Sequence, residues 1–230
     1  MKTNVQTTRR GFTLVELLVV IVIIASLAGL TAPMVIRQRK KADQTEATSN
    51  ARQVGLAFLE FDNEYGSLPG TASIALLDTA ATIKGTAGAN SNGYFKALMQ
   101  ADLTQSEAIF YAKARGTIKP DGNITTDTEA LKKGEVGFGY IAIGTEGLSS
   151  AGNPARPVIL APLTPGAVTL DPAPFDKNLV VLRMDNSVAS LKMKVAAGAT
   201  VGTVTVGTTD LFTSTNPVWD GATPAIKPPL

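Results

Sequence analysis

The sequence contains neither cysteine nor histidine among its 230 residues. Without cysteine the chain cannot form disulfide bonds, and this leaves its compartment open, because disulfides are permitted but not required outside the cytoplasm. Without either residue type it cannot build a Ser-His-Asp triad, a cysteine nucleophile or the usual zinc sites. These absences exclude most hydrolase mechanisms. Carboxylate-pair chemistry, as in glycosidases, and oxygen-ligated metals remain possible, although only scattered aspartates support the former.

An excess of charge of one sign is also lacking. The formal net charge is +2, and three of the basic residues, Lys2, Arg9 and Arg10, precede the main apolar run. Removing these three positive charges from +2 leaves −1 for the rest of the chain. Nucleic-acid-binding domains usually carry a clear basic excess, so no nucleic-acid partner is expected.

What the sequence does contain is one long apolar run, from Phe12 to Ile36, in which Glu16 is the single charged residue. At about 1.5 Å per residue, a helix of this length spans about 37 Å, enough to cross a hydrocarbon core of about 30 Å. A carboxylate within such a run is costly, so Glu16 is expected to have a partner and a function.

The residues around the start of this run, Arg10-Gly11-Phe12-Thr13-Leu14-Val15-Glu16, resemble the processing site of the type IV pilin and type II secretion pseudopilin superfamily. The resemblance is greatest to a type II secretion major pseudopilin. In that family a prepilin peptidase cuts after the glycine and methylates the new N-terminus. The resemblance therefore implies processing between Gly11 and Phe12. It also implies assembly roles for Glu16 and Pro33, the fifth and twenty-second residues of the mature chain.

The same resemblance implies a domain organisation and a location. Residues 1–11 form a leader peptide, residues 12–36 a transmembrane or filament-core helix, and residues 37–230 a periplasmic globular domain. The protein is expected to be a single-pass protein of the bacterial inner membrane that assembles into a filament outside the cytoplasm. Its implied partners are the prepilin peptidase, identical and related pilin subunits, the inner-membrane assembly machinery and membrane lipid. No catalytic residue or cofactor is implied. Some secretion pseudopilins use calcium near the C-terminal sheet, but this sequence has no motif from which its ligands can be carried over, so no metal site is assigned.

Other interpretations of the N-terminus stay open. The run Thr8–Leu14 also resembles a twin-arginine export signal, and the apolar run could be an uncleaved signal anchor that holds a monomeric periplasmic binding domain. Secretory apolar regions usually extend over about 7–15 residues, and a glutamate near their start is atypical, so prepilin-type processing is preferred. Basic residues nearly balance on the two sides of the run, so the positive-inside rule does not decide the orientation.

Residues 37–66 are predicted to continue the helix beyond the membrane. Apolar side chains recur there at spacings of three and four, which places them on one helix face: Ala47, Ala51, Val54, Phe58, Phe61 and Tyr65. Gln44, Glu46 and Asn50 are expected on the opposite face. The helix should end at Gly66–Gly70, where glycine and proline interrupt it. The basic residues at its start either contact anionic headgroups or form a solvated face: Arg37, Arg39, Lys40 and Lys41.

The remaining sequence predicts an α+β fold in which the long N-terminal helix packs on a small antiparallel sheet, as in pilins. Residues 67–134 are interpreted as a variable αβ region and residues 135–195 as the sheet. Four strands are expected there, at 135–143, 157–161, 179–184 and 188–195, with a hairpin turn at Asp185-Asn186. Residues 196–230 are expected to be a tail with one further strand around Val204, pinned to the core by Trp219.

One loop partly imitates a calcium site. Between Asp121 and Glu129, oxygen-bearing side chains stand at alternate positions, as they do in loops that bind Ca²⁺. However, Thr126 replaces the glycine that the EF-hand pattern requires, and Lys132 stands where its bidentate glutamate should be. The sequence therefore favours a solvated loop.

Overall fold

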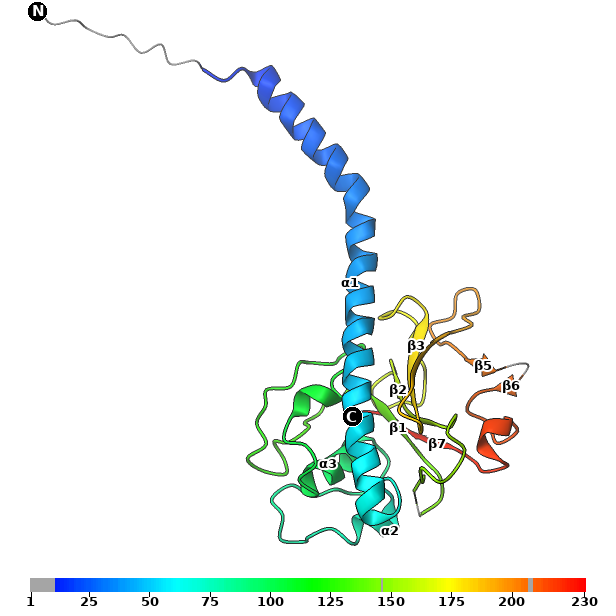
Figure 1. Ribbon diagram of the computed structural model, residues 1–230. Helices are drawn as coiled ribbons and strands as arrows, with labels where there is room; N and C mark the ends of the chain where they lie inside the picture. The colour runs from blue at the N-terminus through cyan, green and yellow to red at the C-terminus, as the bar shows by residue number, and fades with distance from the viewer. Residues whose placement is uncertain (1–10, 146, 207–208) are drawn as a thin grey trace, which may run out of the picture. The chain divides into compact units, whose positions relative to one another are not determined.

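The computed structural model describes residues 11–145, 147–206 and 209–230. The chain divides into two compact units, one that ends at Arg39 and one that extends from Lys40 to Leu230. A single helix, α1 (Leu14–Tyr65), begins in the first unit and ends in the second (Figure 1). Of the expected leader, only Gly11 lies within the described residues; Arg9 and Arg10 lie outside them.

The apolar part of α1 is helical throughout. The helix is continuous at Pro33, although proline has no N–H to donate to the carbonyl of Gly29. The hydroxyls of Ser26 and Thr31 donate to the carbonyls of Val22 and Leu27 at 2.8 and 3.0 Å. Within the described residues, α1 is the one helix that is long and apolar enough to cross a membrane.

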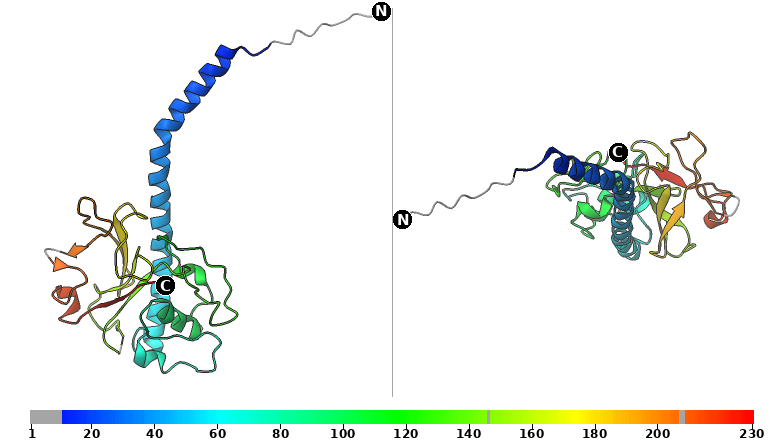
Figure 2. Two further views of the ribbon diagram at one scale, coloured as in Figure 1. Left: turned by 180° about the vertical axis from the view of Figure 1, so that it is seen from behind. Right: turned by 90° about the horizontal axis from the view of Figure 1, so that it is seen from above.

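The second part of α1 is the central element of the globular unit. All but one of the predicted apolar stripe residues are buried, and Tyr65 is half-buried. Gln44, expected on the polar face, is buried as well, because its Nε2 donates to Ser190 Oγ at 2.6 Å and so keeps a hydrogen-bond partner. The buried surface is therefore wider than one stripe. Two parts of the domain cover this surface, because the helix lies between the sheet and the segment 67–134 (Figures 1 and 2).

The sheet confirms the α+β prediction. Its five strands lie in the order β4-β3-β2-β1-β7, and every neighbouring pair is antiparallel. The strands are β1 (Gly139–Ala142), β2 (Pro157–Ala161), β3 (Asn178–Arg183), β4 (Val188–Lys192) and β7 (Ala225–Lys227). Strand β1 is shorter than predicted, because Gly137 N bonds to Phe110 O at 3.0 Å instead of to a neighbouring strand.

The predicted hairpin at Asp185-Asn186 connects β3 to β4. Arg183 N donates to Ser187 O at 2.9 Å, and Asn186 adopts a φ of 60°. Asp185 Oδ1 accepts from Ser187 N at 2.9 Å. A positive φ is tolerated best by glycine and asparagine, which explains why this dipeptide can make the turn.

The segment 67–134 contains three short helices and no strand, so it differs from the expected αβ region. The helices are α2 (Thr71–Ile74), α3 (Asn92–Gln100) and η1 (Glu107–Phe110). Phe95 of α3 packs against Phe58 of α1 and Phe110 of η1, with ring centroids 6.1 and 5.0 Å apart. This aromatic contact ties the segment to α1.

The segment 196–230 also differs from the expected tail, because it covers the second face of the sheet. It contains β5 (Thr205–Val206), β6 (Thr209–Asp210), η2 (Pro217–Trp219) and β7 (Figure 1). Trp219 is fully buried, as predicted, and its Nε1 donates to Leu211 O at 2.6 Å. A second core fills this face: Ile141, Leu160, Leu163, Leu170, Leu179, Val181, Met193, Val204, Leu211 and Trp219.

Candidate functional site in the N-terminal helix

The expected cleavage point lies in an open, non-helical segment directly before α1. Among the described residues, no atom other than those of its chain neighbours lies within 4 Å of the position that a Cβ at Gly11 would occupy. The side chain of Phe12 is 81% exposed. The peptide bond between the two residues is therefore accessible to a peptidase in this conformation.

Glu16 and Thr13 form a capping box at the start of α1. Glu16 Oε2 accepts from Thr13 N at 2.8 Å and from Thr13 Oγ1 at 2.7 Å, and Glu16 N donates to Thr13 Oγ1 at 3.2 Å. Such reciprocal bonds satisfy backbone N–H groups that have no partner inside the helix. The sequence interpretation missed Thr13, although the T-x-x-E pattern is a known sequence signal for this cap.

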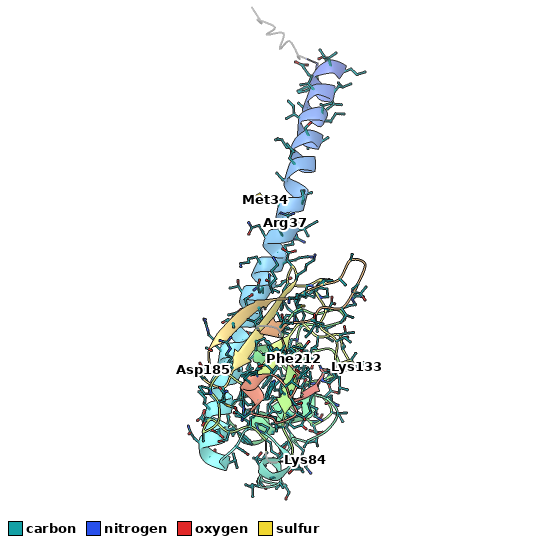
Figure 3. All side chains as sticks on the ribbon, turned by 90° about the vertical axis from the view of Figure 1, so that its right-hand side faces the viewer. Met34, Arg37, Lys84, Lys133, Asp185 and Phe212 are labelled. Carbon is teal, nitrogen blue, oxygen red and sulfur yellow. The ribbon has the colours of Figure 1, made fainter. Side chains whose placement is uncertain are left out.

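From Gly11 to Arg39, no other part of the described chain covers the apolar side chains. Every residue from Gly11 to Arg39 is exposed, including all the large apolar residues between Leu14 and Ile36. Figure 3 shows Met34 and Arg37 projecting from the helix surface. A contiguous exposed apolar surface of this kind marks a membrane or protein interaction site. Glu16 and Pro33 both belong to this surface, one near each end of the apolar run.

The basic residues that follow Pro33 are divided between the two units. Arg37, Arg39 and Lys41 are exposed, while Lys40 is half-buried. Their exposure permits contact with anionic headgroups, and it equally permits a solvated helix face.

In the loop between Asp121 and Glu129, which partly imitates a calcium site, lysine side chains pair with the carboxylates. Lys132 Nζ lies 2.7 Å from Asp121 Oδ2 and 3.0 Å from Glu129 Oε2. Asp127 Oδ1 accepts from Lys84 N at 2.9 Å and lies 3.3 Å from Lys96 Nζ. Ammonium groups therefore already neutralise the carboxylates that an EF-hand-like loop would offer to an ion.

Asp121 of this loop also lies near two carboxylates from outside it. One ligand oxygen from each of Glu107, Asp121 and Glu135 lies within 4.8 Å of the others. Burial raises the pKa of the Glu107 carboxyl above its usual value. Hydrogen bonds from the backbone of Leu131 and Gly122 lower this pKa, and the charges of Glu135 and Asp121 raise it. The sequence analysis missed this cluster, because its members are far apart in the chain and form no local motif.

The long N-terminal helix and the small antiparallel sheet form a pilin-like α+β fold, and the apolar part of the helix is long enough to cross a membrane. Residues 7–32 match the family described as the prokaryotic N-terminal methylation motif. The chain is 35% identical over 92 residues to the type II secretion system core protein G of Escherichia coli strain K12. No solved structure gives a significant match.

The similarity to core protein G is confined to part of each chain. The alignment covers 39% of this chain and 63% of the relative, so this chain spans slightly less than two thirds of that relative's length. Together with the motif match, it confirms the resemblance to the pilin and pseudopilin superfamily. By length and composition, the apolar part of α1 is able to cross a membrane.

Proposed function

We propose that the protein is a prepilin-like subunit that is cleaved after Gly11 and polymerises through its apolar helix into a pseudopilus or type IV pilus filament. The observation that carries this proposal is the coincidence of the methylation motif, residues 7–32, with a helix that is exposed from Leu14 to Ile36. Lipid can cover this surface before assembly, and the same helix of other subunits can cover it afterwards. The function is mechanical, and we assign no catalytic residue.

In this proposal Glu16 sets the axial register between subunits. Cleavage gives Phe12 a free α-amino group that is positive near neutral pH. Where anchors pack without water, an unpaired carboxylate costs several kcal/mol. Pairing Glu16 with the amine of an adjacent subunit offsets this cost only when the two subunits have the correct axial offset. Specifying register in this way is the best-attested role of buried polar groups. The capping bonds use Oε2 for both contacts with Thr13, so Oε1 is the oxygen proposed to meet the amine.

Pro33 is proposed to loosen the helix within the filament. It removes one backbone hydrogen bond to Gly29, and glycine adds conformational freedom at the same turn. We propose that residues 29–33 kink or melt when the subunit is stretched in the filament. A filament structure in which the helix stays intact from Gly29 to Pro33 would contradict the melting.

N-terminal sequencing and intact-mass measurement of the membrane-extracted protein test the processing step. We expect the chain to begin at Phe12 with a methylated amine. Gly11→Val should block cleavage, because a bulky side chain keeps the peptidase from the backbone, whereas the matched control Gly11→Ala should still be cut. A Gly11→Val chain that is shortened at its normal position would refute the proposed role of Gly11.

The alternative function is a monomeric binding domain on an uncleaved anchor. A surface cleft of about 470 Å³ supports it, because Lys40, Arg115 and Lys177 contribute positive charge to its lining. Among the described residues, Arg115 is the one of these three that pairs with a carboxylate, at 3.4 Å from Asp171 Oδ2. N-terminal sequencing distinguishes the two functions, because an anchored binding protein keeps Met1. Such a protein also stays monomeric.

A further inference from the structure

The surface cleft of the globular unit lies where α1 enters that unit. Lys40, the first residue of the unit, contributes to the lining of the cleft. Three further segments complete the lining: Arg115 in the loop that follows η1, the turn 171–177 before β3, and the loop 195–200 that follows β4. The volume of the cleft is about 470 Å³, within the range of about 300–1,000 Å³ that is typical of small-ligand sites.

The charges in the lining favour an anionic ligand. Cations outnumber carboxylates there by three to two, since Lys40, Arg115 and Lys177 face Asp171 and Asp176. Among the described residues, neither lysine forms an ion pair. The Arg115 side chain is 69% exposed, and its Nε lies 3.4 Å from Asp171 Oδ2. The arginine therefore pairs through Nε and keeps its two terminal nitrogens for a ligand.

Asp171 acts as a positioning residue for Arg115. Its side chain is 3% exposed, and its Oδ1 accepts from Ala173 N at 3.0 Å. Its Oδ2 is buried and accepts no hydrogen bond from the described residues, so the carboxylate depends on the arginine for its counter-charge. A guanidinium held at Nε presents its other nitrogens as a fork, and this fork matches the spacing of phosphate oxygens.

The turn that carries Lys177 has an unusual backbone. Asp176 and Lys177 adopt φ values of 52° and 63°, in the left-handed region that residues other than glycine rarely adopt. Lys177 N donates to Pro172 O at 2.8 Å, and Lys177 O accepts from Met193 N at 2.8 Å. These bonds hold the strained turn beside the cleft, and such strain is concentrated at functional sites.

The remaining wall of the cleft is formed by an uncharged loop. Residues 195–200 line it, and Ala196, Ala197 and Ala199 are exposed. The sequence has no charged residue from Val195 to Thr209. Small apolar side chains next to a few cations suit a ligand that has both a charged group and carbon chains.

The position of Lys40 along α1 identifies the source of such a ligand. Lys40 follows Ile36, the last residue of the apolar run, by four residues (40 − 36), which is about 6 Å of helix. The polar layer on each side of a hydrocarbon core is about 5–7 Å thick. We propose that the cleft binds the phosphate of a membrane phospholipid through Lys40, Arg115 and Lys177, with the loop 195–200 against the glycerol and the first acyl carbons.

This site would hold the globular unit at the membrane surface until assembly removes the subunit from the bilayer. The inference rests on the proposed membrane anchor and not on polymerisation. Its failure would leave cleavage after Gly11 and assembly through Glu16 untouched. Conversely, headgroup binding can be measured in a subunit that does not assemble.

The test uses the full chain in dodecyl maltoside micelles, which contain no phosphate. Because the protein has no cysteine, Ala197→Cys provides a single site in the cleft for an environment-sensitive fluorophore. Dihexanoylphosphatidylglycerol should change its fluorescence in a saturable way, whereas dihexanoylglycerol, which lacks the phosphate, should not. The same label at Ala151→Cys, an exposed position outside the cleft, is the control and should not respond to the phospholipid.

Substitutions in the labelled protein decide whether the cations are responsible. Arg115→Gln and Lys177→Gln should each raise the phospholipid concentration at half-response about fivefold, the effect of one charge near a membrane surface. Lys113→Gln, which removes an exposed lysine outside the cleft, is the matched control and should bind normally. Lys177 has no ion pair to lose among the described residues, so its variant tests binding even if Arg115→Gln misfolds.

Two results would overturn the site. One is a labelled cleft that does not respond to the phospholipid, and the other is equal affinity in Lys177→Gln and Lys113→Gln. Glycerol 3-phosphate distinguishes a lipid from a soluble phosphate ester. A half-response to it at the same concentration as to the phospholipid would refute the lipid source and favour the monomeric binding domain.

Discussion

The two parts of helix α1 differ in what surrounds them. From Leu14 to Ile36 every residue is exposed although the sequence is almost entirely apolar. From Gln44 to Asp62 the helix is more polar, yet one broad face of it is buried by its own domain. Apolar composition alone therefore does not bury a helix within its chain. The first part needs a cover from outside, and the second part receives one from the sheet and from the segment 67–134.

The hydrogen-bond partners of polar groups on α1 also differ between its two parts. In the exposed part they are satisfied within one turn, as Glu16 is by Thr13 and Thr31 by Leu27 O. In the buried part they bond to distant segments: Asn50 Nδ2 donates to Tyr111 O at 2.9 Å, and Asp62 Oδ2 accepts from Ser150 N at 3.0 Å. Local satisfaction means that these polar groups of the first part need no tertiary partner for their hydrogen bonds. The second part is bound to one tertiary structure.

The largest expected effect is on assembly, from changes at Glu16. Glu16→Ala and Glu16→Gln should both be cleaved and inserted normally, yet enter filaments at least tenfold less often than wild type. Removing one partner of a buried ion pair costs about 3–5 kcal/mol, which is ample for this effect. Counting mutant subunits in sheared filaments after co-expression with wild type measures it.

Two comparisons separate charge from helix capping at this position. Glutamine can replace glutamate in a capping box, so Glu16→Gln should keep the cap and lose only the charge. Thr13→Ala should lose the cap and keep the charge. If Thr13→Ala and Glu16→Ala are excluded from filaments but Glu16→Gln is not, capping rather than ion pairing is the function of Glu16.

In the buried part of α1, the strongest expected effect is on stability. Phe58 is 2% exposed and packs against Phe95 and Tyr140. Phe58→Ala should lower the free energy of unfolding by about 3–5 kcal/mol, because it leaves a cavity in the core. Leu56→Ala, at an exposed position of the same helix, should change it by less than about 0.5 kcal/mol. Urea unfolding of both variants in micelles makes the measurement, and equal effects would show that α1 is not buried as described.

A glycine-to-alanine change should destabilise the domain in the buried part of α1 and not in the exposed part. In a helix interior alanine is favoured over glycine by about 1 kcal/mol. At Gly55, however, the new Cβ would clash with the side chains of Asn186 and Leu182, and overpacking of this kind costs about 1–3 kcal/mol. At Gly29 the position is open. Gly55→Ala should therefore lower the unfolding midpoint of the domain, and Gly29→Ala should leave it unchanged; a rise with Gly55→Ala would contradict the close approach of α1 to the β3–β4 hairpin.

The smallest expected effect comes from Gln44. Its bond to Ser190 joins α1 to strand β4, and Ser190 is exposed enough to bond with water instead. Gln44→Ala should therefore cost about 0.5–1.5 kcal/mol, measured by urea unfolding. Gln53→Ala, at an exposed position of the same helix, is the control and should cost nothing measurable.

Parts of the globular domain could be predicted because their signals are local. The apolar spacing between Ala47 and Tyr65 predicts a buried helix face, and Asp185-Asn186 predicts a hairpin turn. Strand β2 has the predicted bounds, Pro157–Ala161, because its apolar run is continuous and flanked by turn residues. The burial of Gln44 was not predicted, because a polar side chain can be buried wherever a distant partner satisfies it.

The sequence by itself determined the long apolar helix and its N-terminal methylation motif, since hydrophobic length, helix period and the T-x-x-E cap are all encoded by residues close together in the chain. Only the tertiary structure decided that the glycine-, threonine- and proline-rich segment 196–230 covers a sheet face and supplies the strand β7. It also decided that Glu107, Asp121 and Glu135 meet. These contacts join residues far apart in sequence, and their stability comes from burial and charge that no local pattern records.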